Sequence, residues 1–209
     1  GQGRATPFGY MADGQLNVLY EKYDRRGGAG TISRLRPKRD NVLKRSRNML
    51  TGGGHTYPFT LQHGDDILVL ITDTKLGVVR LYRVNTSNDA LEHVSDLLAV
   101  PLRAPTLLQH EGRWWLMGTA APYEMSGLRV FHSNDLLGPY TAHARDPVKQ
   151  DVRTAVPAGT PFVHEGALYR PALDASTGDR VTLMRVLRLD PQEFEEEPAS
   201  TIGPLKGSP

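Results

Sequence analysis

Short runs of alternating apolar and polar residues, separated by turn-forming residues, recur along most of the chain. The first is "TPFGYMADGQLNVLYEKYD" from Thr6, which contains a Pro-Phe pair, an Asp-Gly turn and a second alternating run. Alternation with a period of two is typical of β-strands, and Asp-Gly between two such runs is typical of a hairpin. The pattern predicts an all-β protein.

The same arrangement returns three more times: "YPFTLQHGDDILVLITD", "APTLLQHEGRWWLMGTA" and "TPFVHEGALYRPALD". Its anchoring prolines, spaced 51, 47 and 56 residues apart, are Pro7, Pro58, Pro105 and Pro161. Two more strand-like runs follow each hairpin, such as "GVVRLYRVN" and "LEHVSDLLAV" in the second repeat. Four short strands in a period of about 50 residues are the signature of a β-propeller blade.

We therefore expect a single propeller domain over residues 1–209. Its four blades of four strands would lie near residues 6–50, 55–100, 103–151 and 159–200. A five-bladed propeller is the alternative blade count. A β-sandwich would also be all-β, but a sandwich does not predict a repeat.

This architecture predicts where a site would lie. Because the second strand of a blade runs antiparallel to the first, the starts of first strands and the ends of second strands meet at one mouth. Apart from Ala104, the positions concerned carry acids, bases and hydroxyls: Thr6, Glu21, Asp24, His55, Tyr57, Asp73, Arg103, Thr119, Thr160 and Asp174. We expect the site at this mouth.

The composition limits the classes of binding partner and cofactor that we expect. The net charge of +2 gives no argument for nucleic acid, and no apolar run approaches the roughly 18 residues of a membrane span. The first residues contain no apolar signal core, which favours a cytoplasmic protein. The chain has no cysteine, so disulfides and thiolate chemistry are excluded. We expect no cofactor and no metal, because no His, Asp and Glu cluster has metal-ligand spacing; the oligomeric state stays open.

Several segments together resemble one known family. In chain order, "GGGHTYPF", "GRWWL", "LLGPY" and "LYRPALD" are similar to the N-terminal propeller domains of glucosamine inositolphosphorylceramide transferases and their bacterial relatives. Those domains are similar in turn to family-43 glycoside hydrolases. The resemblance runs from about Ala5 to Phe194 and implies a propeller with a sugar-directed mouth.

The chain also departs from this family. Relatives typically carry an aspartate where Thr6 and Ala104 stand, and they read Pro-Glu-Thr where this chain has Thr72-Asp73-Thr74. Glycosidic cleavage ordinarily needs two carboxyl groups, and Thr6 and Ala104 supply none. Ordinary hydrolysis is therefore disfavoured, unless Glu21, Asp73 and Asp174 recreate the pair. Relatives also continue into a segment containing Gly-Thr-His-Thr that is absent here, which bears on the five-blade alternative.

The candidate catalytic residues are His55, Asp73 and Asp174. Histidine titrates near neutral pH, and the two acids end second strands at the predicted mouth. For each, a structural role is the alternative: a hydrogen-bonded rim histidine, a turn cap at Asp73 and an Asx turn at Asp174.

The candidate substrate-binding residues are Glu21, Tyr57, Arg103, Arg153 and Arg170. An arginine fork can bind a carboxylate or phosphate of a substrate, or it can form a structural ion pair. Packing is the alternative for Tyr57, and a solvated strand end is the alternative for Glu21. Of Trp114 and Trp115, at least one should be core, since alternation puts them on opposite faces.

Two charged runs are expected at the surface. The basic run "RLRPKRDNVLKRSR" should occupy solvated outer strands of the first blade, with an anionic partner as the alternative. The acidic run "EFEEEP" should be exposed near the C-terminus.

These features predict an intracellular enzyme of a biosynthetic pathway that has kept a glycosidase-like propeller and changed its chemistry. We expect acid/base work of lyase, cyclase or isomerase type on a small polar or sugar-like substrate. A glycoside hydrolase of family-43 type and a non-catalytic carbohydrate-binding or scaffold propeller are the alternatives.

Overall fold

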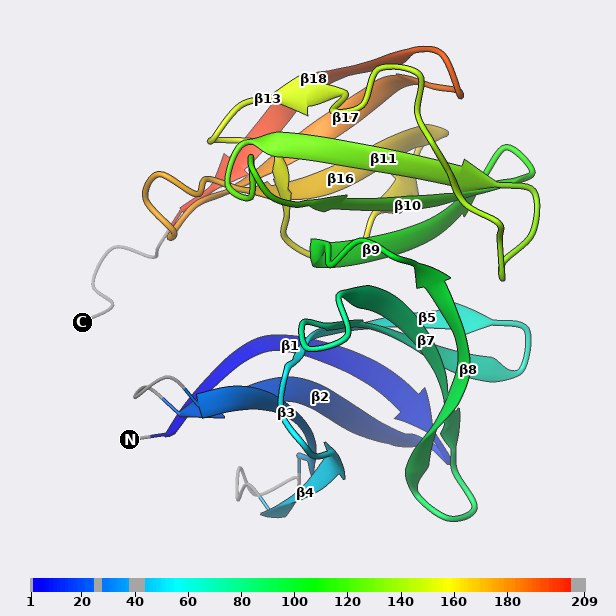
Figure 1. Ribbon diagram of the computed structural model, residues 1–209, viewed down its shortest axis with the longest axis vertical. Helices are drawn as coiled ribbons and strands as arrows, with labels where there is room; N and C mark the ends of the chain where they lie inside the picture. The colour runs from blue at the N-terminus through cyan, green and yellow to red at the C-terminus, as the bar shows by residue number, and fades with distance from the viewer. Residues whose placement is uncertain (1, 25–27, 38–43, 204–209) are drawn as a thin grey trace. The chain divides into compact units, whose positions relative to one another are not determined.

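The computed structural model describes residues 2–24, 28–37 and 44–203, which form antiparallel strands joined by turns and loops (Figure 1). The described residues include no helix that is long and apolar enough to cross a membrane. The strands form four sheets, one for each sequence repeat. The all-β prediction is therefore confirmed.

The first two sheets are meanders of four strands, each strand pairing with the next. The first contains β1 (Gln2–Ala12), β2 (Gln15–Asp24), β3 (Gly28–Arg36) and β4 (Lys44–Leu50). The second contains β5 (His55–His63), β6 (Asp66–Asp73), β7 (Val78–Asn85) and β8 (Ala90–Leu98). Together they form one compact unit, Gly1–Pro101, hereafter unit 1.

The other two sheets have short or divided edge strands. The third contains β9 (Arg103–His110), β10 (Arg113–Thr119), β11 (Gly127–Ser133), β12 (Thr141–Ala142) and β13 (Lys149–Gln150), and the last two both pair with β11. The fourth contains β14 (Val156–Pro157), β15 (Phe162–His164), β16 (Ala167–Leu173), β17 (Val181–Leu189) and β18 (Phe194–Ile202). These sheets form the second compact unit, Leu102–Pro209, hereafter unit 2.

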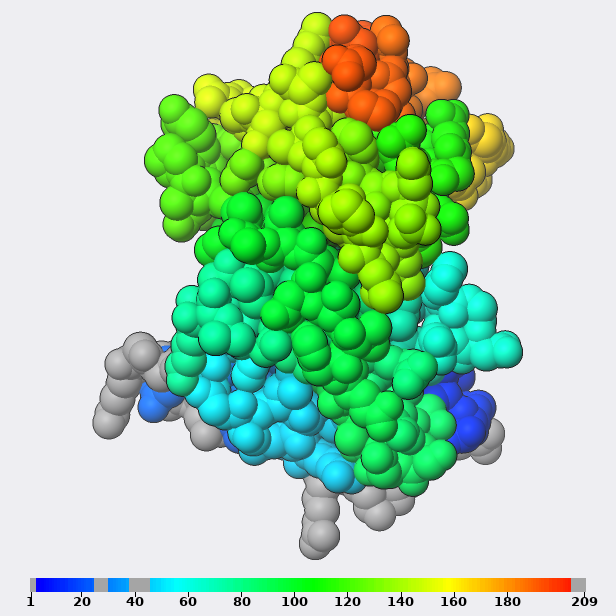
Figure 2. Space-filling model, turned by 45° about the vertical axis from the view of Figure 1, so that its right-hand side comes forward, coloured from blue at the N-terminus to red at the C-terminus, as the bar shows by residue number. Residues whose placement is uncertain are grey.

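The sheets follow the predicted blade boundaries closely. They span residues 2–50, 55–98, 103–150 and 156–202, against predicted blades near 6–50, 55–100, 103–151 and 159–200. The prediction of one domain over residues 1–209 stays a prediction. In unit 2 the segment that follows β11, drawn in yellow-green, lies on the surface (Figure 2).

The hairpin turns have the geometry that their sequences require. Asp13 and Gly14 have φ of 50° and 69°, and the Glu-Gly pairs of the third and fourth repeats have similarly positive values. Two successive residues with positive φ define a type I′ turn, whose twist matches that of the flanking strands.

The first strands are irregular just before the repeated prolines. Thr6, Tyr57 and Ala104 have φ of 49°, 53° and 51°, and the pairing register shifts at each of these sites. A proline has no N–H for a ladder hydrogen bond, so it fits a bulge better than a regular strand. In the fourth sheet, Pro161 lies between β14 and β15, where pairing is interrupted.

Each unit has its own apolar core. The core of unit 1 includes Leu19, Ile32, Val69 and Ile71, and the core of unit 2 includes Trp115, Met117, Val130 and Leu168. Trp114 and Trp115 are both buried, at 4% and 2% exposure. The prediction that at least one is core is confirmed, and neither ring offers an open face to a sugar.

Candidate functional site

His55 and Asp73 face each other at one edge of the second sheet. His55 begins β5 and Asp73 ends β6, and the two residues are paired in the antiparallel ladder. Their side chains are 10% and 7% exposed, and Nε2 of the imidazole lies 3.6 Å from Oδ2 of the carboxylate. The other ring nitrogen, Nδ1, is buried and has no hydrogen-bond partner among the described residues.

The carboxylate of Asp73 also caps a turn. Its Oδ1 accepts hydrogen bonds from the backbone N–H groups of Lys75 and Leu76, each at 3.0 Å. Its Oδ2, which faces His55, lies 3.7 Å from Nη1 of Arg80 on β7. The turn-capping alternative for Asp73 and its placement beside His55 are therefore both observed.

The electrostatics favour a neutral imidazole. Burial lowers the pKa of His55, and the facing Asp73 carboxylate opposes part of this decrease, while Arg80 and Lys75 add to it. A neutral ring carries one N–H and one lone pair. The carboxylate favours the tautomer with the hydrogen on Nε2, which leaves the Nδ1 lone pair available to accept a proton.

Glu21 lies near the start of β5 because Gly30 permits a close approach of two strands. A Cβ at position 30 would be 2.4 Å from the carbonyl oxygen of His55 and 3.1 Å from Oε1 of Glu21. Gly30 therefore brings β3, and the carboxylate of Glu21 on β2, against the strand that begins with His55. Sequence reasoning named Glu21 and His55 but not the glycine between them.

At this edge of unit 1, Tyr57 is buried and Thr6 is half-buried. Tyr57 is 8% exposed, and its ring packs edge-on against Phe8 with centroids 4.9 Å apart, as the packing alternative predicted. The hydroxyl oxygen of Thr6 is buried and has no hydrogen-bond partner among the described residues.

Arg170 of unit 2 is bound by the protein itself. Its side chain is 1% exposed, and Nε and Nη2 donate to the two oxygens of Glu196 at 3.0 and 2.7 Å. Nη2 also donates to the carbonyl oxygen of Thr154 at 2.6 Å. This is the structural ion pair that the sequence left open as the alternative to a substrate-binding role. The prediction that the acidic run is exposed is wrong at Glu196, whose side chain is 2% exposed.

The other candidates in unit 2 lie at or near the surface. Arg103 and Arg153 are exposed. The carboxylate of Asp174 accepts a hydrogen bond from the backbone N–H of Ser176 at 3.0 Å. It also accepts one from the hydroxyl of Ser176, and this second bond lowers the pKa of Asp174. Asp174 thus forms the Asx turn that was its alternative. The prediction that Asp174 shares a mouth with His55 stays a prediction.

The basic run of the first blade is partly buried. It lies on β3 and β4 as predicted, but Arg34 is only 6% exposed and, with Arg36 and Arg47, pairs with Asp89. The expectation of a fully solvated run is therefore wrong at Arg34. Residues 38–43 of the run lie outside the described residues. The described residues contain no group of three or more His, Asp or Glu side chains able to hold a metal ion.

Comparisons with known proteins identify the fold and the family. A family 117 glycoside hydrolase from Zobellia galactanivorans superposes with a TM-score of 0.71 at 14% identity, over 97% of this chain and 70% of the hydrolase. A thermostable family-43 glycoside hydrolase superposes with a TM-score of 0.64 at 14% identity, over 98% of this chain and 77% of the hydrolase. An exo-β-1,3-galactanase from Phanerochaete chrysosporium was crystallised with β-1,3-galactotriose. It superposes with a TM-score of 0.66 at 14% identity, over 88% of this chain and 46% of the galactanase. The four sheets are thus blades of a β-propeller fold, as predicted.

The sequence relatives are much longer than this chain, and the match covers a small part of their length. Glucosamine inositolphosphorylceramide transferase 1 of Oryza sativa subsp. japonica is 31% identical over 155 residues, which are 69% of this chain and 21% of the transferase. The chain therefore spans about a fifth of the length of this relative. The family profile described as glucosamine inositolphosphorylceramide transferase 1, N-terminal, matches residues 3–203. The chain belongs to this family of transferase N-terminal domains, as the sequence resemblance predicted.

Proposed function

We propose that this domain acts on a sugar-like substrate at the His55 edge of unit 1, and that its chemistry is proton transfer rather than hydrolysis of a glycosidic bond. The observation that carries the proposal is the state of the His55 ring. One ring nitrogen faces a carboxylate at 3.6 Å, and the other is buried with no hydrogen-bond partner in the part of the chain that the structure describes. A histidine beside a carboxylate, with its second ring nitrogen uncommitted, has the components of a general base.

The role of each residue follows from its position. Nδ1 of His55 would take a proton from the substrate, because its lone pair is free in the favoured tautomer. Since Nδ1 is buried, the proposal requires that substrate binding opens this edge of unit 1. Asp73 would stabilise the imidazolium that forms, since its Oδ2 lies beside Nε2. Arg80 would help to hold the carboxylate in place, since its Nη1 lies 3.7 Å from Oδ2. Such a general base typically contributes a rate gain of roughly a hundred- to ten-thousand-fold.

A sugar-like substrate is supported by the relatives. The related rice protein is named glucosamine inositolphosphorylceramide transferase 1, and a structural neighbour was crystallised with β-1,3-galactotriose. Hydrolysis is disfavoured because Thr6 and Ala104 offer no carboxyl group at the bulged strand starts, where the family typically has aspartate. Many lyase, cyclase and isomerase reactions include removal of a proton from the substrate, which is the step that the His55 site would perform.

The test is solvent deuterium incorporation. The protein is incubated in D2O with glucose, galactose, glucosamine, N-acetylglucosamine and glucuronate, and each sugar is followed by proton NMR. Proton abstraction next to the carbonyl of the open-chain form predicts loss of the corresponding C–H signal with wild-type protein and not with His55→Ala. Binding of a sugar without exchange would indicate the non-catalytic binding domain instead.

A parallel assay addresses hydrolysis. The domain is incubated with a panel of aryl glycosides, and release of the phenol is measured by absorbance. We expect no release above the buffer rate. Robust turnover that is lost in Asp73→Asn would establish a glycoside hydrolase and contradict the proposal.

A further inference from the structure

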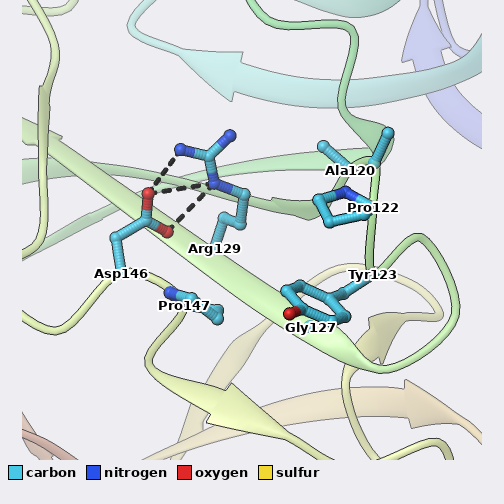
Figure 3. A pocket seen from close by; sticks show the side chains of 8 residues that line it. Ala120, Pro122, Tyr123, Gly127, Arg129, Asp146 and Pro147 are labelled. Carbon is cyan, nitrogen blue, oxygen red and sulfur yellow. Dashed lines mark hydrogen bonds and ion pairs between the residues drawn. The ribbon is translucent and has the colours of Figure 1, made fainter.

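A pocket of unit 2 lies over strand β11, within the third sheet. It has a volume of about 250 Å³ and is bordered by the loop that joins β10 to β11 and by the segment that leads to β13. Its walls include Pro122, Tyr123, Arg129, Asp146 and Pro147 (Figure 3). None of the sequence-predicted site residues lies in it.

The polar wall of the pocket is an arginine–aspartate pair. Nε of Arg129 donates to both oxygens of Asp146 at 3.0 Å, and Nη2 donates to Oδ2. The guanidinium lies over the ring of Phe131, 5.0 Å from its centroid. The other terminal nitrogen makes no hydrogen bond to a described residue and points away from the carboxylate (Figure 3). The pair therefore presents a free donor beside acceptor oxygens that have unused lone pairs.

The opposite wall is apolar and partly open. Tyr123 is 48% exposed, and its ring stands with Pro122 on the side of the β10–β11 loop, across from Pro147 and the ion pair (Figure 3). An accessible aromatic ring facing a hydrogen-bonding pair suits a ligand with one apolar face and polar edges.

We propose that this pocket binds the ring of a neutral sugar. One hydroxyl oxygen would accept from the free guanidinium nitrogen, the adjacent hydroxyl would donate to Asp146, and the C–H face would pack on Tyr123. Because Asp146 neutralises Arg129, the pocket favours an uncharged polyol over an anion. A volume of about 250 Å³ is below that of most drug-sized pockets, so a single ring fits and a long oligosaccharide does not.

This proposal does not depend on the His55 site, because every residue of the pocket belongs to unit 2. The competing explanation is that the Arg129–Asp146 pair only fastens β11 to the segment before β13. That explanation predicts a change in stability on mutation but no sugar binding.

Saturation-transfer NMR with the methyl glycosides of glucose, galactose, mannose and xylose, and with glucuronate, separates the two explanations. We expect at least one neutral glycoside to bind with a dissociation constant on the order of 1–10 mM, as is usual for so small a ligand. Tyr123→Ala should weaken this binding about fivefold to tenfold. The control variant Phe162→Ala removes another exposed aromatic ring of unit 2, at 42% exposure, and should leave the binding unchanged.

A second variant, Asp146→Asn, tests the polar wall of the pocket in the same binding experiment. It removes the neutralising charge while keeping the shape of the side chain, so glucuronate should bind more tightly to this variant than to wild type and the neutral glycoside less tightly. Melting temperatures of all variants show whether each remains folded. Absence of binding by every glycoside, or binding that survives both Tyr123→Ala and Asp146→Asn in folded protein, would overturn the proposal.

Discussion

Asp73 lies directly opposite His55 in the β5–β6 ladder, and its carboxylate serves two groups at once. One oxygen accepts two backbone hydrogen bonds of the following turn, and the other faces the imidazole at 3.6 Å. The turn bonds fix the carboxylate before any substrate arrives. A rigid acid beside a buried base is a preorganised arrangement, in which little reorganisation is needed when charge develops.

The first prediction concerns pH. Burial lowers the pKa of His55 below its ordinary value of about 6.5, so the unfolded chain binds a proton more readily than the folded protein. The stability associated with neutral His55 is therefore fully present above about pH 6.5 and is lost as the pH falls through the folded pKa. In thermal unfolding between pH 7.5 and 5, His55→Gln should show a smaller fall in melting temperature than wild type. Part of the fall in melting temperature should remain in His55→Gln, because burial also lowers the pKa of His132 and this histidine is unchanged in the variant.

The second prediction separates the two functions of Asp73. Asp73→Asn keeps an acceptor for the turn and removes the charge beside His55, whereas Asp73→Ala removes both. We expect Asp73→Ala to lose about 1–3 kcal/mol of unfolding free energy, and Asp73→Asn to lose less. In Asp73→Asn the pKa of His55, measured by NMR titration, should fall further, since the carboxylate charge holds it up. An unchanged His55 pKa would show that the two groups do not interact.

The third prediction concerns the buried pair of Arg170 and Glu196. Arg170→Met leaves Lys149, whose Nζ lies 2.9 Å from Oε1, as the ion-pair partner of the buried Glu196. We therefore expect a loss of about 2–4 kcal/mol in urea unfolding, below the cost of a fully unpaired buried charge. The matched control is Arg185→Met, which breaks an exposed pair between β17 and β18 of the same sheet, where the side chains of Arg185 and Glu197 are 50% and 54% exposed. The control should cost about 0–1 kcal/mol. Equal costs for the two variants would contradict the structural role assigned to Arg170.

The fourth prediction tests the bulge at the start of β9. Ala104 has a φ of 51°, a conformation that is costly for an L-residue with a side chain and free for glycine. Ala172, within β16, is also buried but does not have a positive φ. Ala172→Gly should lower the unfolding free energy. The change in unfolding free energy caused by Ala104→Gly, measured by chemical unfolding, should be about 1 kcal/mol more favourable than that caused by Ala172→Gly. A cost at Ala104 equal to that at Ala172 would contradict the strained conformation.

The parts of the fold that local sequence determines were predictable. Asp13-Gly14 and the equivalent pairs can form the tight turns that a two-residue hairpin needs, so the hairpins and the repeat followed from the sequence. The pairing of His55 with Asp73 also followed, because the start of a first strand must meet the end of the second.

What depends on register and burial was not predictable. Arg80 approaches Asp73 from a third strand, and only the pairing of β6 with β7 places it there. Glu196 looked like one of several equivalent surface acids in "EFEEEP", yet it is the one enclosed with Arg170, 26 residues away. The Arg129–Asp146 pocket depends on a loop geometry that no periodic pattern encodes.

The most direct test of the account is the rate of solvent deuterium incorporation into a sugar substrate by wild-type protein and by His55→Ala, with both shown to be folded by circular dichroism and melting. The account predicts exchange by wild type on at least one sugar of the panel, and a rate at least about a hundredfold lower in His55→Ala. Equal rates in the two proteins, or no exchange by wild type on any sugar of the panel, would contradict the assignment of His55 as the base.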